Sequence, residues 1–206
     1  LELNNFDSFD LQLDKSNFDI RDIITPTVNT FEKRCQDRGI FLESIFLTDN
    51  TIVYADRTKI QQVIYNLVDN AIKFTPEGRQ IRVQVTEKDN KIFTSVKDEG
   101  IGIPKDAQKK VFERFYKTDP SRGKDKTGTG LGLAITKEII KAHGEQITLT
   151  SEEGKGSEFI FSLPKEKDML VPIKPVHIES RNEGYSEADT SSPSIKSNGK
   201  FRIKDS

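Results

Sequence analysis

The chain has 206 residues, 33% of them hydrophobic and 32% charged, which allows one domain of roughly 150 residues and a remainder. Lysine and arginine number 32 against 33 aspartates and glutamates, so no overall basic excess points to nucleic acid. The single Cys35 excludes an internal disulfide, the two histidines argue against a zinc site, and no apolar run predicts a transmembrane helix or signal peptide.

The first predicted elements alternate between strand and helix. A short strand is predicted over 17–20, and aliphatic residues then recur at helical spacing over 23–38, which predicts a helix. Two strands over 40–46 and 51–55 follow, joined by a turn. Asp56 is placed to cap the next helix.

This next helix, over 56–74, separates its residues into two faces. At about 100° per residue, one side gathers aliphatic residues: Ile60, Val63, Ile64, Leu67, Val68, Ala71 and Ile72. The other side carries Asn66, Asn70 and Lys73, one turn apart. Asparagine is a poor helix former, so this row indicates either a ligand-facing surface or an ordinary solvated face.

A hairpin and a short helix come next. Strands over 80–87 and 91–96 alternate apolar and polar residues around a tight turn at 89–90. The second strand runs into Asp98 and two glycines, so a carboxylate lies at a strand exit. A proline then opens a short helix over 104–112.

The remaining elements are a loop, a helix, a hairpin and a tail. The basic stretch 118–129 has no core-facing period, and we expect a mobile loop. A second amphipathic helix follows over 131–142, and a final hairpin over 145–163. Beyond Pro164 the composition turns to Ser, Pro, Lys, Glu and Asn, which predicts disorder.

Several of these features suit a nucleotide. An asparagine carbonyl is a hard oxygen suited to Mg²⁺, and glycines at a helix start let backbone amides reach an anion. A buried carboxylate such as Asp98 can accept a hydrogen bond from the exocyclic amine of adenine, which guanine lacks at that edge. The P-loop and dinucleotide fingerprints are excluded, since no GxxxxGK[ST] occurs and Leu133 replaces the third glycine of GxGxxG.

Five motifs stand in order along the chain: NLVDNAIKF (66–74), DEGIG (98–102), FERFY (112–116), GTGLGL (128–133) and GKGS (154–157). Together they resemble the asparagine, glycine and phenylalanine boxes of the ATP-binding catalytic domain of sensor histidine kinases, in the GHKL superfamily with its Bergerat fold. The resemblance implies an α+β fold, a two-layer sandwich with a mixed sheet of about five strands, about three helices on one face, and an ATP lid loop between Tyr116 and Gly128.

The resemblance implies ATP and Mg²⁺ as cofactors and assigns roles to individual residues. Asn70 would hold Mg²⁺, Asn66 would position the phosphate end, and Lys73 would contact phosphate. Asp98 would take the adenine amino group, with Phe74 packed near the ring. The implied nucleotide-binding residues are Asn66, Asn70, Lys73, Phe74, Asp98, Gly100, Gly102, Ile103, Tyr116, Thr127, Gly128, Thr129, Gly130, Leu131 and Gly132.

Arg114 and Lys117 are candidates for closing on the γ-phosphate and join Asn66 and Lys73 as implied catalytic residues. Lys117 stands where an arginine is common after the phenylalanine box. A lysine offers a point charge instead of a bidentate fork, so slower transfer is expected.

Other residues are predicted to have structural roles. Phe112 and Phe115 are expected to be core residues that anchor the lid. His143 ends a helix, where we predict a capping role, and His177 falls in the tail, so neither is expected to be a phosphoacceptor.

The resemblance implies donation of the ATP γ-phosphoryl group to a histidine on a separate helical domain, for relay to a response-regulator aspartate. We therefore expect 1–15 to be a linker from a helical hairpin absent from this chain, 16–164 to be the catalytic domain, and 165–206 to be a disordered tail. The parent protein would be membrane-anchored with this part in the cytoplasm, touching neither nucleic acid nor membrane.

Two alternatives differ in what the bound nucleotide does. In a non-transferring module, ATP would only order the lid and switch a protein contact. An ATPase of the gyrase or chaperone type would use a glutamate at the position of Asn66 to activate water. The asparagine there favours transfer to a protein over hydrolysis.

Overall fold

The computed structural model describes residues 11–117 and 129–166, which form five helices and seven strands. The helices are α1 (Arg21–Thr30), α2 (Glu32–Asp37), α3 (Arg57–Phe74), α4 (Lys105–Gln108) and α5 (Gly132–Ala142). The strands are β1 (Lys15–Asp19), β2 (Phe41–Phe46), β3 (Ile52–Asp56), β4 (Gln80–Lys88), β5 (Lys91–Asp98), β6 (Ile147–Glu152) and β7 (Gly156–Pro164).

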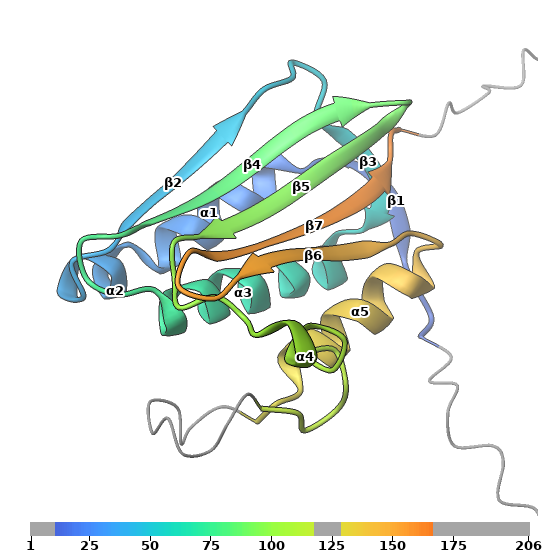
Figure 1. Ribbon diagram of the computed structural model, residues 1–206. Coiled ribbons are helices and arrows are strands. Elements are labelled where there is room, and N and C mark those ends of the chain that lie inside the picture. Colours follow the sequence, from blue (N-terminus) through green and yellow to red (C-terminus); the bar gives the residue numbers. More distant parts are fainter. Residues whose placement is uncertain (1–10, 118–128, 167–206) are drawn as a thin grey trace, which may run out of the picture. The chain divides into compact units, whose positions relative to one another are not determined.

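A five-stranded sheet makes one layer, and helices lie along one of its faces (Figure 1). The strand order is β2-β4-β5-β7-β6, with β2 and β4 parallel and the other neighbours antiparallel. Helix α3 runs between α1 and α5 and packs on β5. The predicted two-layer sandwich with a mixed five-stranded sheet is confirmed, and both predicted hairpins are present.

The core lies between the helices and the inward face of the sheet. All seven aliphatic residues predicted for the inner face of α3 are buried. Alternate residues of β4, Ile81, Val83 and Val85, are fully buried beneath them. The side chain of Asp56 accepts a hydrogen bond from the Lys59 backbone N–H at 3.0 Å, so the predicted cap of α3 is confirmed.

The stretch 23–38, predicted to be one helix, is divided into α1 and α2, so its predicted continuity was wrong. The Thr30 hydroxyl donates to the carbonyl of Thr27 at 2.6 Å. The N–H of Phe31 bonds at 3.0 Å to the carbonyl of Val28 instead of that of Thr27. This competition by a side chain tightens the turn and ends α1.

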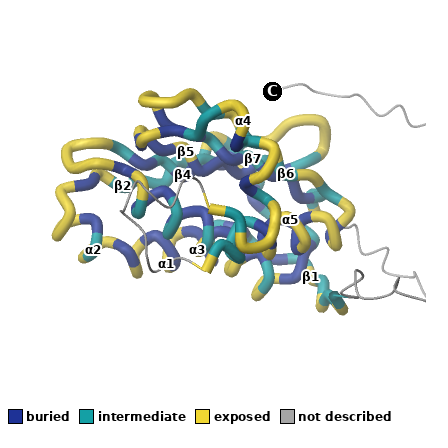
Figure 2. Tube along the Cα trace, turned by 60° about the horizontal axis from the view of Figure 1, so that its bottom comes forward, coloured by how far each residue is buried: buried dark blue, intermediate teal, exposed yellow. Residues whose placement is uncertain are grey.

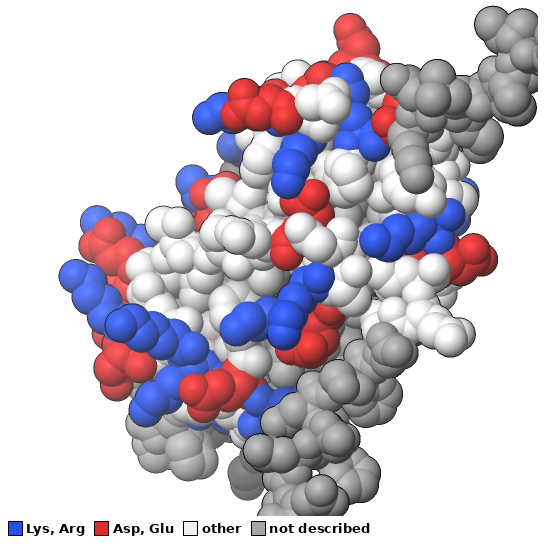
Figure 3. Space-filling model, turned by 90° about the vertical axis from the view of Figure 1, so that its right-hand side faces the viewer, with Lys and Arg blue, Asp and Glu red and all other residues white. Residues whose placement is uncertain are grey.

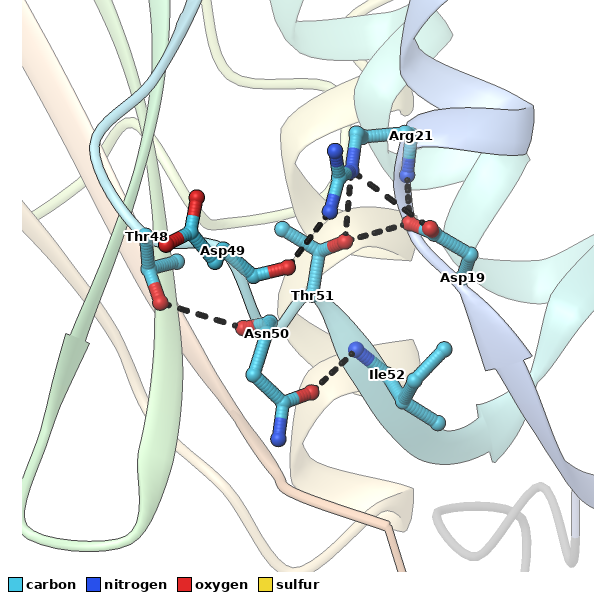
Figure 4. Close-up of polar contacts among 7 residues, drawn as sticks. All are labelled: Asp19, Arg21, Thr48, Asp49, Asn50, Thr51 and Ile52. Atoms are coloured by element: carbon cyan, nitrogen blue, oxygen red, sulfur yellow. Dashed lines mark hydrogen bonds and ion pairs between the residues drawn. The ribbon is translucent and has the colours of Figure 1, made fainter. Parts of the chain in front are cut away.

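The two strands predicted around the turn at 49–50 exist, but they pair in different sheets. Strand β2 lies parallel to β4, while β3 pairs with β1 in a separate two-stranded sheet. Figure 4 shows the contacts at the start of β3: Arg21 donates to the Asp49 carbonyl at 2.6 Å and the Thr51 hydroxyl at 2.7 Å, and that hydroxyl donates to Asp19 at 2.6 Å. These bonds tie the start of β3 to the end of β1.

Helix α4 is shorter than the helix predicted over 104–112. Beyond it, the N–H of Lys110 bonds to the carbonyl of Ala107 and the N–H of Glu113 to that of Lys110, both at 2.8 Å. This i to i−3 spacing belongs to tight turns, and the i to i−4 bond from the Val111 N–H to the Ala107 carbonyl (3.1 Å) is not continued, so the α-helical path ends there.

The described surface is mixed in charge. Figure 3 shows lysine and arginine side chains interspersed with aspartate and glutamate over one face, without a continuous basic area on that face. Any anion site there would therefore be local. Among the helices of the described ranges, none has the length and apolar content needed to cross a membrane.

His143 is buried and joins the end of α5 to the start of α3. Its Nε2 accepts a hydrogen bond from the Asp56 backbone N–H at 3.0 Å, so Nδ1 carries the proton and donates to the Ile139 carbonyl at 2.8 Å. The predicted structural role is confirmed. Burial holds the pKa of His143 below its ordinary value, against the hydrogen bond and carboxylates that raise it.

We expect the stability contributed by His143 to depend on pH. Because its pKa is lower in the folded state, the contribution is fully present above the unfolded pKa of about 6.5 and is lost as the pH falls below it. In H143Q the ring no longer titrates, so the difference in unfolding free energy between wild type and variant should shrink on acidification. Urea unfolding across this pH range measures it; a difference independent of pH would contradict the role.

Candidate functional site

The predicted site residues come from three segments that the fold brings together: the second half of α3, the exit of β5, and the start of α5. The α3 helix packs against both β5 and α5. Figure 2 shows exposed residues on the chain around α4, which connects two of these segments. The site is therefore assembled at one end of the sandwich from residues distant in sequence.

Asp98 is the last residue of β5 and is only 6% exposed. Its Oδ1 accepts hydrogen bonds from the backbone N–H groups of Gly100 at 2.8 Å and Ser157 at 3.3 Å. Within the described residues Oδ2 takes no hydrogen bond, so it remains available as an acceptor. Burial raises the pKa of Asp98 to about 6, against the two backbone donors that lower it.

Gly100 lets the exit of β5 approach the end of α3. A Cβ at this position would lie 2.6 Å from Oδ1 of Asp98 and 2.7 Å from the carbonyl oxygen of Phe74. The N–H of Ile101 bonds to that same carbonyl at 3.2 Å. The ring of Phe74 is partly exposed beside this junction, as its predicted position near a base requires.

Gly102 lies against the turn between β6 and β7. Its φ is +67°, and a Cβ would lie 2.0 Å from the Glu152 carbonyl oxygen. On either side, the N–H of Gly154 bonds to the Ile101 carbonyl and the N–H of Ile103 to the Ser151 hydroxyl, both at 2.8 Å. The last glycine motif thus supports the first, a contact that nothing in the sequence indicated.

Asn66 and Asn70 lie half-buried on the polar face of α3. The Asn66 amide nitrogen donates to the Gly132 carbonyl at 3.3 Å, which joins α3 to the first residue of α5. The Asn70 amide makes no hydrogen bond to residues 11–117 or 129–166. Of these two amides one turn apart, Asn66 is engaged with the start of α5, and within the described residues Asn70 is free to take a ligand.

Lys73, predicted to contact phosphate, is held by a residue that the sequence reading missed. Its Nζ lies 2.8 Å from Oδ2 of Asp69, and Oδ1 of Asp69 lies 2.5 Å from Nη1 of Arg34 on α2. Burial would raise the pKa of Asp69, but hydrogen bonds and charge from Lys73 and Arg34 outweigh it and hold the pKa low. The i, i+4 spacing could have revealed the pair on α3, whereas Arg34 carried no local signal.

The two phenylalanines of the FERFY motif behave differently. Phe112 packs edge-on against Phe159, with ring centroids 6.0 Å apart, as a core residue should. Phe115 is 72% exposed, so its predicted core position was wrong. Its φ is +64° and its N–H bonds to the Gly130 carbonyl at 2.9 Å, so its backbone, not its ring, anchors the start of α5.

The other predicted residues flank the segment 118–128, which is outside the described residues, as are Thr127 and Gly128. Arg114 and Lys117 are exposed, and Tyr116 is half-buried. At the start of α5, Thr129 Oγ1 accepts from the Leu131 N–H at 3.4 Å. The structure thus collects the asparagines, Asp98 and Gly132, and leaves the two candidate γ-phosphate cations on exposed chain beside the undescribed segment.

Comparison with known proteins gives consistent matches. Residues 55–167 match the family described as histidine kinase-, DNA gyrase B-, and HSP90-like ATPase. The chain is 40% identical over 171 residues to sensor histidine kinase WalK of Bacillus subtilis (strain 168), covering 82% of this chain and 28% of that protein. It is 35% identical to sensor protein RprX of Bacteroides fragilis (strain YCH46), covering 80% and 32%. The chain thus spans about a third or less of these relatives.

Among solved structures, the catalytic domain of histidine kinase ThkA is 33% identical with a TM-score of 0.66, covering 74% of this chain and 97% of that one. Full-length ShkA in complex with AMPPNP is 28% identical with a TM-score of 0.65, covering 75% and 32%. Sequence, fold and motif order agree: the chain belongs to the histidine kinase-, DNA gyrase B- and HSP90-like ATPases, as the ATP-binding catalytic domain of a two-component sensor histidine kinase.

Proposed function

We propose that this domain transfers the γ-phosphoryl group of Mg²⁺-bound ATP to a histidine on a separate helical domain, for relay to an aspartate of a response regulator. The observation that carries the proposal is the spacing of two unlike groups along α3. Gly100 brings the Asp98 carboxylate close to the Phe74 backbone, while Asn66 and Gly132 meet two turns away, about 12 Å along the helix. A base acceptor and a phosphate end are thus separated along one helix.

Two relatives support the ligand and the partner. ShkA was solved with AMPPNP, and ThkA was solved in complex with the response regulator protein TrrA. By analogy, we assign ATP and a response regulator to this chain as well. The ThkA complex is 30% identical with a TM-score of 0.62 over 74% of this chain, so the analogy rests on sequence as well as fold.

At the base end, the chain's own groups would orient the adenine. Oδ2 of Asp98 would accept from the exocyclic amine, with the ring near Phe74 and the backbone at Gly100, Gly102 and Ile103. At the phosphate end, backbone amides at the start of α5 would face the anion, where the helix dipole favours negative charge. Lys73, Arg114 and Lys117 would add positive charge.

The donor set at the phosphate end fits Mg²⁺. In the described part of the chain, no cluster of three or more His, Cys, Asp or Glu side chains could cage a metal. The free amide oxygen of Asn70 is a hard ligand, and Mg²⁺ typically takes one or two protein ligands and completes its shell with phosphates and water. When bound, Mg²⁺ would offset charge on the phosphates as the bond to the leaving ADP oxygen breaks and the bond to the histidine nitrogen forms.

Asn66 favours transfer over hydrolysis. Its amide nitrogen donates to the Gly132 carbonyl. A glutamate, which gyrase-type and chaperone-type ATPases use here to activate water, would set a carboxylate against that carbonyl oxygen, with no proton to share. The contact that joins α3 to α5 therefore needs an amide, and the site lacks a general base at this position.

The same proposal divides the chain into a linker (1–15), a catalytic domain (16–164) and a tail (165–206). It is supported by the first strand, which starts at Lys15, one residue before the proposed catalytic domain, and by the last, which ends at Pro164. We propose that the parent protein is anchored in a membrane, with this domain on the cytoplasmic side, as the resemblance to sensor histidine kinases implies.

Incubating the full chain with γ-labelled ATP, Mg²⁺ and the separately produced phosphoacceptor domain of the WalK relative tests the proposal. We expect acid-labile, base-stable label on the acceptor only when both proteins are present. N70A should reduce labelling at least about tenfold, because it removes the proposed metal ligand. Q62A, an exposed position on the same helix, is the matched control. ATP binding without any labelling would favour the non-transferring module instead.

A further inference from the structure

A chain of ion pairs leads from α2 to the phosphate end of the site. Each carboxylate oxygen of Asp69 has its own cation: Lys73 at 2.8 Å and Arg34 at 2.5 Å. The side chains of Arg34, Asp69 and Lys73 are 40%, 20% and 25% exposed, so the group is partly shielded from water. Helix α2 belongs to none of the five motifs, yet it reaches the helix that carries three of the proposed phosphate-end residues, Asn66, Asn70 and Lys73.

We propose that Arg34 is a positioning residue for the polyphosphate and acts through Asp69 on Lys73. With Arg34 present, the three side chains sum to one positive charge beside Asn70. Without it, Asp69 and Lys73 sum to zero, and the carboxylate is left one residue from the proposed metal ligand. Arg34 thus offsets the negative charge that Asp69 places beside Lys73 and the phosphate end. This inference rests on the proposed ATP site.

A second arginine on the same segment separates this role from a structural one. Arg38 donates to the Ile72 carbonyl, and at 3.2 Å to the Thr75 carbonyl, so it satisfies the C-terminal end of α3. Anchoring of the helix end therefore falls to Arg38. Arg34 instead forms an ion pair with the side chain of Asp69. Losing this pair should therefore change the charge near the site without changing the backbone of α3.

Charged and uncharged ligands should respond differently to the loss of Arg34. Loss of one positive charge beside the phosphate end weakens the attraction for a triphosphate and has almost no effect on a nucleoside without phosphates. In R34Q, affinity for ATP should therefore fall while affinity for adenosine stays the same. Removing the carboxylate as well, in R34Q/D69N, should restore ATP affinity, because Lys73 is then no longer offset by Asp69 and the lost positive charge is recovered.

Calorimetric titration of the full chain with MgATP and with adenosine tests this. We expect R34Q to weaken ATP binding about fivefold, R34K and R34Q/D69N to stay within about twofold of wild type, and the loss to shrink at high salt. The matched control is K91Q, which breaks the Lys91–Glu145 pair (2.7 Å) on the far end of β5 and should leave both ligands unaffected.

Three outcomes would overturn the inference. Equal losses of affinity for ATP and for adenosine in R34Q would show that Arg34 has a structural role. R38Q, which removes an arginine with a structural role, is the reference for such a loss. An unchanged ATP affinity in R34Q, with wild type preferring ATP to adenosine, would contradict this inference but not the proposed function. A wild type that does not prefer ATP to adenosine would contradict both the inference and the proposed function.

Discussion

Replacing Asp98 by asparagine is expected to weaken ATP binding about a hundredfold while stabilising the unliganded domain at neutral pH. The two effects have one cause, the burial of a carboxylate that meets only two backbone donors. They would be opposite in sign, so a single substitution separates the requirements of the fold from those of the ligand.

The loss of affinity follows from which oxygen is already engaged. Oδ1 accepts from the N–H groups of Gly100 and Ser157, so the carbonyl oxygen of an asparagine must take that place. Its NH₂ group then occupies the position of Oδ2 and faces the adenine amine, donor against donor. GTP presents a carbonyl at that edge, so D98N should also lose its preference for ATP over GTP.

The gain in stability follows from the pKa of Asp98. Its pKa rises from 3.8 to about 6 on folding, so the folded state holds the proton more tightly than the unfolded chain. The favourable contribution is present below pH 3.8 and is lost as the pH rises through about 6. Above pH 6 the buried carboxylate costs stability, and D98N should be more stable by about 2 kcal/mol at pH 8 and by less at pH 5.

Urea unfolding at these two pH values, together with titrations of both nucleotides, measures both effects. D22N, an exposed carboxyl in the first turn of α1, is the control and should show neither. If D98N binds ATP as tightly as wild type does, Asp98 does not contact the adenine base. One that is equally destabilised at both pH values would show a purely structural carboxylate.

Features that depend on neighbouring residues were predictable from the sequence. The buried face of α3 and its Asp56 cap follow from spacing within one helix, and the hairpin of β4 and β5 from a turn whose residues Asp89 and Asn90 both take positive φ. These signals are local, because the residues that determine each conformation lie within a few positions of one another in the sequence. The motif order then indicated the family.

Features that depend on contacts between residues distant in the sequence were not predictable from it. The parallel pairing of β2 with β4 joins strands separated by two other elements, and the sequence of neither strand indicates which strand it pairs with. Asp69 meets Arg34 across 35 positions. Phe115 was misplaced because its sequence looks apolar and core-like, whereas a left-handed backbone bonded to Gly130 leaves the ring exposed. Each of these is a tertiary choice between partners that sequence spacing does not distinguish.

Replacing Gly102 by alanine is expected to destabilise the domain by about 4 kcal/mol, far more than a left-handed glycine usually costs. The added Cβ would lie 2.0 Å from the Glu152 carbonyl oxygen, a backbone atom that no rotamer change can move. Relief requires the segment after β5 to leave the β6–β7 turn. That separation breaks the bonds of Gly154 to Ile101 and of Ile103 to Ser151.

Gly154 supplies a matched control from the other side of the same contact. Its φ is +82°, close to that of Gly102, but nothing lies within 4 Å of a Cβ built on it. G154A should therefore cost only the left-handed conformation, about 1 kcal/mol. Urea unfolding of both variants isolates the clash by difference, and equal costs would show that backbone conformation alone is responsible.

ATP binding by G102A and G154A tests whether Gly102 supports the nucleotide site as well as the packing of the domain. Gly102 is four residues from Asp98, and the β6–β7 turn it touches leads to Ser157, whose N–H bonds to that carboxylate. If the segment leaves the turn, Asp98 loses part of its support, so G102A should weaken ATP binding well beyond G154A at a temperature where both are folded. A G102A variant that is unstable yet binds ATP normally would separate the packing of this glycine from the adenine site. Loss of both would mean that the first glycine motif serves the nucleotide through its contact with the last.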